Sequence, residues 1–563
     1  MLTPPFHRRG LNSWQIVFIS ISGILGSGLC VRSGIILRIG GPSTVLVAYA
    51  VVGMVATLVM FAIGEMICLW PISNALGRFV RKFVDKELGQ VVSVAYWFAY
   101  SIGFASLIAA AARQAQYWGC TPWAFIFAPM FILTLINLLP VGLYGWTEVG
   151  GGVLKTILIF VAIFCMAAIN AGSNDERKPI GAKYFRDGQS GFQVEKDHAN
   201  SYVAALFIAF QIATTSFVGV EIPALAAAEA KLDEKPTERG TSLFIFPAAR
   251  ALKFSVLYLP FLMAVVFFMA GLVASLNVSW SNPSLPSEGW GLGEECSKSG
   301  SSSSVFVISA IDSGIRGLAG AFTFFVVSSA WTAANTNLYV ASRALHGMVT
   351  QRTTLFSWLA NTNKRRAPIA AVLVSAIAFI WVPIFNGVDN DYLPLTNDIL
   401  VEMATVSCVF VWACECAAYL RFYYHMMSFQ KEIDEAVTRD PDSPFRYLMR
   451  DLQKQGEYPL RTHFQPWSTW IALFACIVGI LGAAGSSWLW KGWNGVEDTR
   501  AFLSAYLVLL FYFALWLVLK AYNNRHNPFH ASAYFKRFKR LNRWDGFSQI
   551  VEDLFQLREG VQG

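Results

Sequence analysis

Long apolar runs recur along this chain, and they constrain its fold more than any other feature. Each run of about 20 residues is long enough to cross roughly 30 Å of hydrocarbon as a helix. A helix satisfies its own backbone hydrogen bonds, as a lipid environment requires. Twelve such runs lie at about 14–37, 43–70, 91–117, 123–141, 150–170, 202–228, 251–276, 305–342, 369–387, 399–420, 467–489 and 501–520. We therefore expect an all-α integral membrane protein with about twelve transmembrane helices.

The composition agrees with this expectation. Hydrophobic residues occupy 55% of the 563 positions and charged residues 14%, with a mean hydropathy of +0.46, whereas soluble domains carry about 25% charged residues. The eighth run is too long for one crossing, so we expect a short external helix at about 305–315 before a span that begins at Gly317. The first run is too long for a cleavable signal peptide.

The distribution of Lys and Arg predicts the orientation in the membrane. With the N-terminus inside, 29 of the 44 Lys and Arg residues fall in segments that face the cytoplasm, as the positive-inside rule requires. We expect cytoplasmic tails at 1–13 and 521–563 around a transmembrane domain at 14–520. The net charge of +8 follows from this topology, so it does not indicate a nucleic-acid partner.

The first span contains an unusual density of glycine. Its centre reads Ser22-Gly23-Ile24-Leu25-Gly26-Ser27-Gly28, and each Gly costs a helix about 1 kcal/mol relative to Ala. Such a stretch suits an interrupted helix, because bare backbone N–H groups at a helix N-terminus bind carboxylates. A face of small residues for close helix packing is the alternative interpretation.

The sixth span has a second interruption. Phe217-Val218-Gly219-Val220-Glu221-Ile222-Pro223 places Gly, Pro and an acid in an apolar run. Interrupted helices at corresponding positions of two halves indicate a midplane binding site in secondary transporters. We therefore expect a 5+5 inverted repeat with broken helices 1 and 6, formed by about 14–170 and 202–420, and two additional helices at about 467–520.

Two ionisable residues inside spans are candidates for proton coupling. Lys155 lies in the fifth span, where a central charge costs at least about 2.5–3.5 kcal/mol, and desolvation penalises its charged form. With the span beginning at 150, Lys155 is about five residues from the inner end, so snorkelling to the surface is equally open. Glu221 is the alternative proton carrier, and a structural role capping the span 6 break is open for it too.

Other patterns indicate binding or modification. Asn335 in span 8 needs hydrogen-bond partners, either a ligand or a neighbouring helix. Asn277-Val278-Ser279 is a glycosylation sequon on the predicted outside face, and Cys120 and Cys296 in predicted outside loops are a candidate disulfide pair. The sequence contains no nucleotide-binding glycine loop with GK[ST], no GxSxG and no His/Cys metal cluster. We therefore expect neither an enzyme nor a cofactor.

Seven motifs occur together in a known family. They are SGILGSGL in span 1, PISNALGRFVRKFVDKELG after span 2, QYW ending span 3, the pair Glu148 and Lys155 around the start of span 5, SFVGVEIPALAAAEA in span 6, AANTNLYVASRAL in span 8 and YLRF ending span 10. Over about 14–520 the chain resembles the fungal amino acid permeases of the amino acid–polyamine–organocation superfamily.

The resemblance implies proton-coupled import of amino acids, with the plasma membrane as the expected location. It places the substrate α-carboxylate on the backbone of Ser22, Gly23, Gly26, Ser27 and Gly28. It places the α-ammonium on carbonyls of Phe217, Val218 and Gly219, with Asn335 as a further substrate-binding residue. Glu221 matches the family's Gly-x-Glu, and Lys155 matches a lysine proposed as proton-responsive in related transporters.

The chain departs from the family pattern in three places. Ala227-Ala228-Glu229 stands where Ala-Gly-Glu is usual, Gly145-Trp146 stands where Gly-Glu is usual, and span 3 lacks an acidic residue. These departures bear on substrate choice. Two other functions stay open: a transporter-like nutrient receptor, which would usually carry a long cytoplasmic tail, and a permease for amines, polyamines or choline, which would leave the amide-rich break of span 1 unused.

Overall fold

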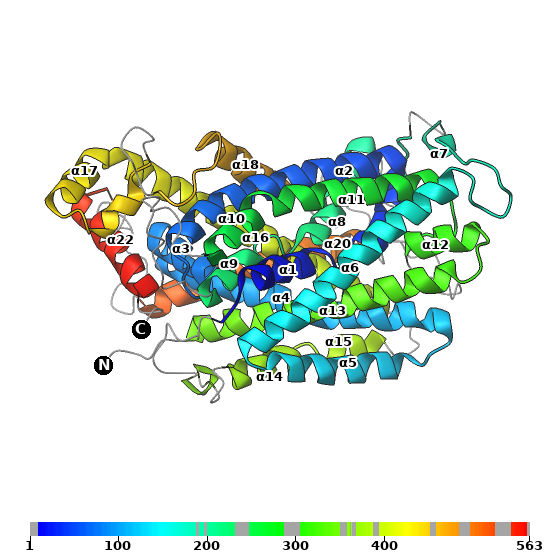
Figure 1. Cartoon of the computed structure of the whole chain (residues 1–563), viewed down its shortest axis with the longest axis horizontal. Helices are drawn as coiled ribbons and strands as arrows, with labels where there is room; N and C mark the ends of the chain where they lie inside the picture. Colours follow the sequence, from blue (N-terminus) through cyan, green and yellow to red (C-terminus); the bar gives the residue numbers. More distant parts are fainter. Residues whose placement is uncertain are drawn as a thin grey trace.

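The protein is a bundle of long α-helices (Figure 1). The computed structural model describes residues 10–26, 28–186, 191–195, 199, 201–230, 247–286, 304–349, 357–360, 362, 367–386, 393–450, 458–482, 496–523 and 542–559. Within these residues β structure is limited to isolated bridges, one of which joins Leu11 and Ala230.

The α-helices have the following bounds: α1 Ser13–Ile24, α2 Gly28–Leu69, α3 Ala75–Phe83, α4 Lys86–Ala115, α5 Pro122–Asn137, α6 Val141–Asn170, α7 Lys183–Arg186, α8 Tyr202–Phe217, α9 Ile222–Ala226, α10 Pro247–Leu257, α11 Leu259–Asn277, α12 Val305–Asp312, α13 Leu318–Val349, α14 Ile369–Ile377, α15 Trp381–Asn386, α16 Leu393–Ser428, α17 Gln430–Arg439, α18 Trp467–Leu481, α20 Val496–Asn523 and α22 Trp544–Glu559. Short 3₁₀ turns lie at Gln116–Trp118, Ala227–Glu229, Ser357–Ala360 and Pro444–Leu448.

All twelve predicted spans contain helix. Eight helices in the described part of the chain are long and apolar enough to cross a membrane, and the four other predicted spans correspond to the shorter apolar helices Ser13–Ile24, Pro122–Asn137, Ile369–Phe385 and Trp467–Leu481. The predicted all-α membrane fold is confirmed. The relation of its two halves as inverted repeats stays a prediction.

The eighth run is divided as predicted. The short helix α12 ends at Asp312, and the long helix α13 begins at Leu318. Gly314 and Gly317 between them have φ values of 72° and 82°, which glycine adopts without the steric cost that a side chain brings. The glycines therefore allow the chain to turn before it enters the long helix.

The fifth span begins earlier than predicted. Helix α6 starts at Val141, directly after Pro140, and not at 150. Pro140 has no N–H to donate and a fixed φ, so it suits the position just before a helix. The change puts Glu148 inside the helix and Lys155 14 residues beyond its first residue, about 21 Å along the axis.

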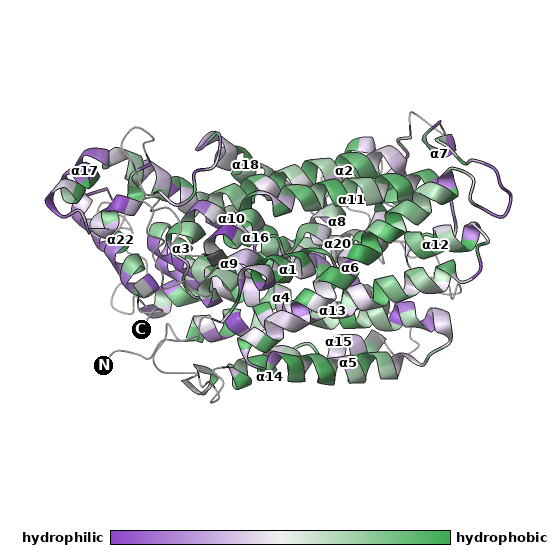
Figure 2. Ribbon diagram, viewed as in Figure 1, coloured by the Kyte–Doolittle hydropathy of each residue, from purple (hydrophilic) through white to green (hydrophobic). Residues whose placement is uncertain are grey.

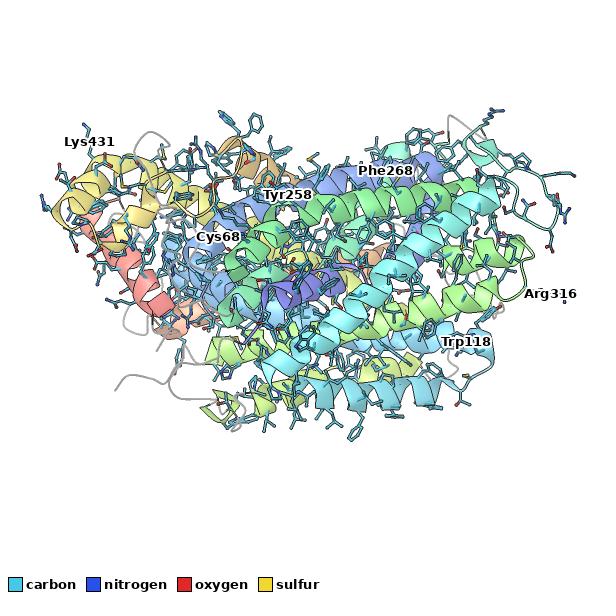
Figure 3. All side chains as sticks on the ribbon, in the orientation of Figure 1. Cys68, Trp118, Tyr258, Phe268, Arg316 and Lys431 are labelled. Carbon is cyan, nitrogen blue, oxygen red and sulfur yellow. The ribbon has the colours of Figure 1, made fainter. Side chains whose placement is uncertain are left out.

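The two ends of the bundle are polar and its middle is apolar. Figure 2 shows hydrophobic residues along the long helices, and hydrophilic residues gathered around α17, α22 and α3 at one end and around α7 at the other. Lys431 marks the first end, and Arg316 and Trp118 mark the opposite one (Figure 3). The outer faces of α5 and α6 expose Phe131 and Phe164 by 67% and 71%, as expected of surfaces that contact lipid.

Two predicted loop features are changed by the structure. Asn277 is the last residue of α11 and is buried, and its Nδ2 donates to the carbonyls of Met166 and Val273 at 2.8 Å each. The atom that would carry a glycan is therefore inaccessible, and the glycosylation assignment is wrong for the folded protein. Cys120 is exposed, while Cys296 lies outside the described residues, so their pairing stays a prediction.

Candidate functional site

The first break follows α1. Leu25 leaves the helix with φ −76° and ψ 77°, its N–H donates to Ile21 O, and the N–H of Gly26 donates to Ile24 O, both at 2.9 Å. Helix α2 then begins at Gly28, and Ser27 lies outside the described residues. The structure thus contains the interruption of span 1 that the glycines predicted.

The second break lies between α8, which ends at Phe217, and α9, which begins at Ile222. Val218 is extended, with ψ 124°, and Gly219 has a φ of 115°, which disfavours any side chain. Phe217 points its ring into the core, with its centroid 5.0 Å from that of Phe267. Only main-chain atoms of Phe217 are therefore suited to meet a ligand here.

The two breaks touch each other. A Cβ atom on Gly219 would lie 2.8 Å from the carbonyl oxygen of Gly23, and one on Gly23 would lie 2.1 Å from Ile222 Cδ1. A Cβ on Gly28 would lie 3.2 Å from Ser216 Cα. The Gly219 contact is to backbone, so glycine is required at 219 for the close approach, whereas a Cβ at Gly23 would need only a shift of the Ile222 side chain.

Gly26 is different from its neighbours. A Cβ placed there would meet Ala333 Cβ at 3.6 Å and Leu107 Cδ2 at 4.0 Å, which are ordinary van der Waals distances. Protein packing therefore does not require glycine at this position. A small side chain there would contact Leu107 of α4 and Ala333 of α13.

Lys155 holds the end of α1. Its side chain is 2% exposed, and Nζ donates to the carbonyl oxygens of Ser22 and Leu25 at 2.8 Å each. These carbonyls lie at the C-terminal, partially negative end of a helix, where a cation is favoured. Ser329 Oγ also donates to Leu25 O at 3.2 Å. The alternative that Lys155 snorkels to the surface is wrong, because the ammonium is directed into the helix 1 break.

Glu148 organises a second set of bonds beside Lys155. Its Oε1 accepts from Asn335 Nδ2 at 2.6 Å and from the Tyr144 hydroxyl at 2.9 Å, and its Oε2 accepts from Thr336 Oγ1 at 3.0 Å. The Asn335 amide oxygen in turn accepts from Asn137 Nδ2 at 2.9 Å. The structure therefore places Asn335 in a network between helices, one of the two roles that the sequence left open.

The role of Glu148 was missed because the predicted span began after it. Tyr144, Glu148 and Lys155 are four and seven residues apart, which puts them on one face of a helix. All three are buried on α6. Had the helix been extended back to Pro140, this spacing would have indicated that the three side chains point to the same place.

Glu221 lies at the second break and is fully buried. The Tyr100 hydroxyl of α4 donates to its Oε1 at 2.5 Å, and Trp412 Nε1 of α16 donates to its Oε2 at 3.1 Å. Its side chain makes no capping hydrogen bond to α9. Glu221 therefore connects the break to α4 and α16, and it also interacts with the backbone of Gly219 and of its own residue at the break.

The end of span 6 is tied to span 8 and to the N-terminal segment. The Tyr339 hydroxyl donates to Glu229 Oε2 at 2.7 Å, and Arg343 Nε lies 3.5 Å from Glu229 Oε1. The N–H groups of Gly10 and Leu11 donate to the carbonyl oxygen of Glu229 at 2.9 and 3.0 Å. Tyr144 stacks on Tyr339 with centroids 4.5 Å apart. These contacts join the end of span 6, span 8, α6 and the N-terminal segment on the predicted cytoplasmic side of the breaks.

The breaks present opposite partial charges near one another. Helix α2 begins at Gly28, packed against Ser216 near the end of α8. The N-terminus of a helix carries partial positive charge and the C-terminus partial negative charge. A small ligand that carries both a carboxylate and an ammonium group matches this pair of helix ends.

Comparison with known proteins gives a consistent family. A family model described as "Amino acid permease" matches residues 15–441. Amino acid transporter 1 of Schizosaccharomyces pombe is 28% identical over 442 residues, covering 76% of this chain and 68% of that protein. The lysine/arginine permease of Candida albicans is 24% identical over 520 residues, covering 91% and 80%. The solved manganese transporter of Eremococcus coleocola is 14% identical, with a TM-score of 0.48 over 90% of this chain and 93% of that one.

Proposed function

The chain belongs to the amino acid permease family, and from this premise we propose that it is a secondary active transporter that imports amino acids by proton symport. The substrate carboxylate would meet the backbone of the first break, at Ser22, Gly23, Gly26, Ser27 and Gly28. The ammonium would meet the carbonyls of Phe217, Val218 and Gly219. The adjacent breaks and their opposite partial charges support this assignment.

The observation that carries the proton-coupling proposal is the pair of bonds from Lys155 to the end of α1. A charged ammonium binds both carbonyls strongly, because one partner of each hydrogen bond is ionised. Loss of its proton removes that charge and weakens the hold on the break. Proton occupancy of Lys155 would therefore bias the position of α1, which is the element that moves against the bundle in our proposal.

Glu221 is the second proposed proton carrier. It contacts α4 and α16 and lies where the second break presents its carbonyls. Its negative charge would attract the substrate ammonium, so proton binding at Glu221 and substrate binding would influence one another. We place the protein in the plasma membrane with both termini in the cytoplasm, in agreement with the excess of Lys and Arg in the segments assigned to the inside.

The test of this function is uptake of radiolabelled compounds by permease-deficient cells that express the chain. The panel contains neutral, acidic and cationic amino acids, the last because several relatives are named as lysine/arginine or basic amino acid permeases, together with choline and a polyamine. Saturable uptake of an amino acid that rises when the outside is acidified supports the proposal. Uptake of the amines alone, or surface expression without uptake of any compound, contradicts it.

Lys155→Ala tests the coupling step. We expect the variant to lose most of the dependence of uptake on external pH, with a smaller change in substrate affinity, because the substrate itself contacts the breaks and not Nζ. Substrate-induced proton uptake is measured in parallel for Glu221→Gln. Lys253→Ala, at the half-buried lysine of α10, is the matched control. Full proton-coupled accumulation by Lys155→Ala would show that Lys155 has a structural role only.

A further inference from the structure

Three buried glutamates lie in succession along one face of α16, and the middle one belongs to the helix itself. Trp412 donates to Glu221 Oε2 at 3.1 Å, and the Tyr419 hydroxyl donates to Glu65 Oε2 at 2.7 Å. Glu415 lies between these two contacts, three residues after Trp412 and four before Tyr419, spacings that share one helix face. The helical rise puts Glu415 about 4.5 Å along the axis from Trp412 and about 6 Å from Tyr419.

The outer two glutamates are surrounded by hydrogen-bond donors. Besides Tyr419, Glu65 accepts from the Tyr458 hydroxyl, Arg450 Nη2, and the N–H and Oγ1 of Thr462, at 2.6–2.9 Å. Glu221 accepts from Tyr100 and from Trp412, whose indole can only donate. Both sites therefore suit an ionised carboxylate.

Glu415 has no such surroundings. Its side chain is 0% exposed, and neither carboxylate oxygen has a hydrogen-bond partner among the residues that the structure describes. Burying an ionised carboxylate without donors or a counter-ion is strongly disfavoured, whereas the protonated acid is neutral. The geometry therefore distinguishes Glu415 from the glutamates on either side of it.

The titratable groups nearest to Glu415 in the described part of the chain are tyrosine and cysteine side chains. Tyr96 of α4 interacts electrostatically with both Glu415 and Glu221. Cys414 and Cys416 flank it on α16, and Cys476 of α18 lies against these two cysteines. Glu65 of α2 contacts Tyr419, which lies one turn after Glu415 on α16. Tyr512 of α20 contacts Ser407, which lies two turns before Glu415 on α16. No cation is among these described neighbours.

We propose that Glu415 is a proton-binding site of the transport cycle, which holds a proton in this conformation. The proposal rests on proton symport as the function. Tyr96 lies near both acids: it interacts electrostatically with Glu415 and Glu221, and its ring centroid lies 4.7 Å from that of Tyr100, whose hydroxyl donates to Glu221.

Infrared spectroscopy of the purified full-length protein tests protonation directly, because a protonated carboxyl group has a carbonyl stretching band that a carboxylate lacks. At neutral pH the wild-type protein should show this band, and Glu415→Gln should lack it. Gln has the shape of the protonated acid, so this variant removes the carboxyl group with little change in packing. Glu415→Met serves as a second variant that also removes the carboxyl group. Glu65→Gln is the matched control and should keep the band, since the donors around Glu65 suit a carboxylate. A band unchanged in both Glu415 variants would overturn the proposal.

Proteoliposomes test the role in transport. Accumulation driven by a pH gradient requires proton coupling, while counterflow of labelled against unlabelled amino acid requires only movement of substrate. Glu415→Gln should lower accumulation about tenfold, the factor equivalent to one pH unit, and counterflow much less. Wild-type accumulation by Glu415→Gln would overturn the proposal. If the wild-type protein itself fails in counterflow, amino acid transport is refuted. The infrared test of Glu415 protonation does not depend on that outcome.

Discussion

Gly219 and Gly23 show how single residues create the site. With φ at 115° and a virtual Cβ only 2.8 Å from the Gly23 carbonyl oxygen, Gly219 allows two helix breaks to meet through their main chains. Lys155 then satisfies two carbonyls that the end of α1 leaves free. The proposed binding surface consists mostly of backbone atoms, so the absence of side chains matters as much as their identity.

Gly26→Val separates the carboxylate cradle from packing. Because the nearest atoms to a Cβ at Gly26 are at 3.6–4.0 Å, the variant should fold and reach the membrane, while the added methyl groups cover the backbone of the break. We expect uptake to fall at least about tenfold, equivalent to about 1.4 kcal/mol of lost substrate stabilisation. Uptake is measured per molecule at the cell surface. Gly150→Val on α6, where a Cβ meets nothing within 4 Å, is the control. Near-normal uptake by Gly26→Val would contradict the cradle.

At the scale of elements, one end of the bundle is held by segments from the C-terminal part of the chain. Phe555 of α22 packs on Trp70 with centroids 5.8 Å apart, and Asp553 of α22 pairs with Lys82 at 2.7 Å. Residues 458–462 lie at the end of α2, where Tyr458 and Thr462 bind Glu65. These segments are therefore attached to the bundle.

Tyr458→Phe tests that attachment. Burial and the neighbouring Glu65 carboxylate raise the pKa of the Tyr458 hydroxyl well above its ordinary value, so the group stays protonated and donates. Removing it leaves a buried carboxylate with one donor fewer and should cost about 1–3 kcal/mol. We expect a lower midpoint of thermal denaturation in detergent and faster proteolysis of the 421–465 segment. Tyr117→Phe, at a 40% exposed tyrosine at the opposite end, should change neither; equal stability of the two variants would disprove the attachment.

At the scale of the whole molecule, the bundle has two distinct polar ends. Helices α3, α17 and α22 lie at one end and α7 and α12 at the other (Figure 1). The first group comes from segments that the Lys and Arg distribution assigns to the cytoplasm, and the second from segments it assigns to the outside. The division of these helices between the two ends of the bundle therefore agrees with the division that the Lys and Arg distribution predicts.

Labelling of intact cells tests the orientation. A membrane-impermeant maleimide should modify the exposed Cys120 in a Cys296→Ser background, and Cys120→Ser should abolish that signal. A tag in 277–304 should likewise be accessible from outside, and one in 421–465 only after permeabilisation. The reverse pattern would invert the orientation and every assignment of inside and outside.

The sequence by itself determined that all twelve apolar runs contain helix and where both breaks lie. These properties are local: hydrocarbon-length apolar runs must be helical in a bilayer, and three glycines within seven residues weaken a helix wherever it lies. What only the tertiary structure decided is which side chains meet. Lys155 reaches Ser22, Asn335 reaches Glu148, and Glu415 reaches no donor among the described residues, across separations of more than 100 positions for the first two. Such contacts depend on the rotation and depth of each helix against its neighbours, which hydropathy and spacing along one helix do not specify.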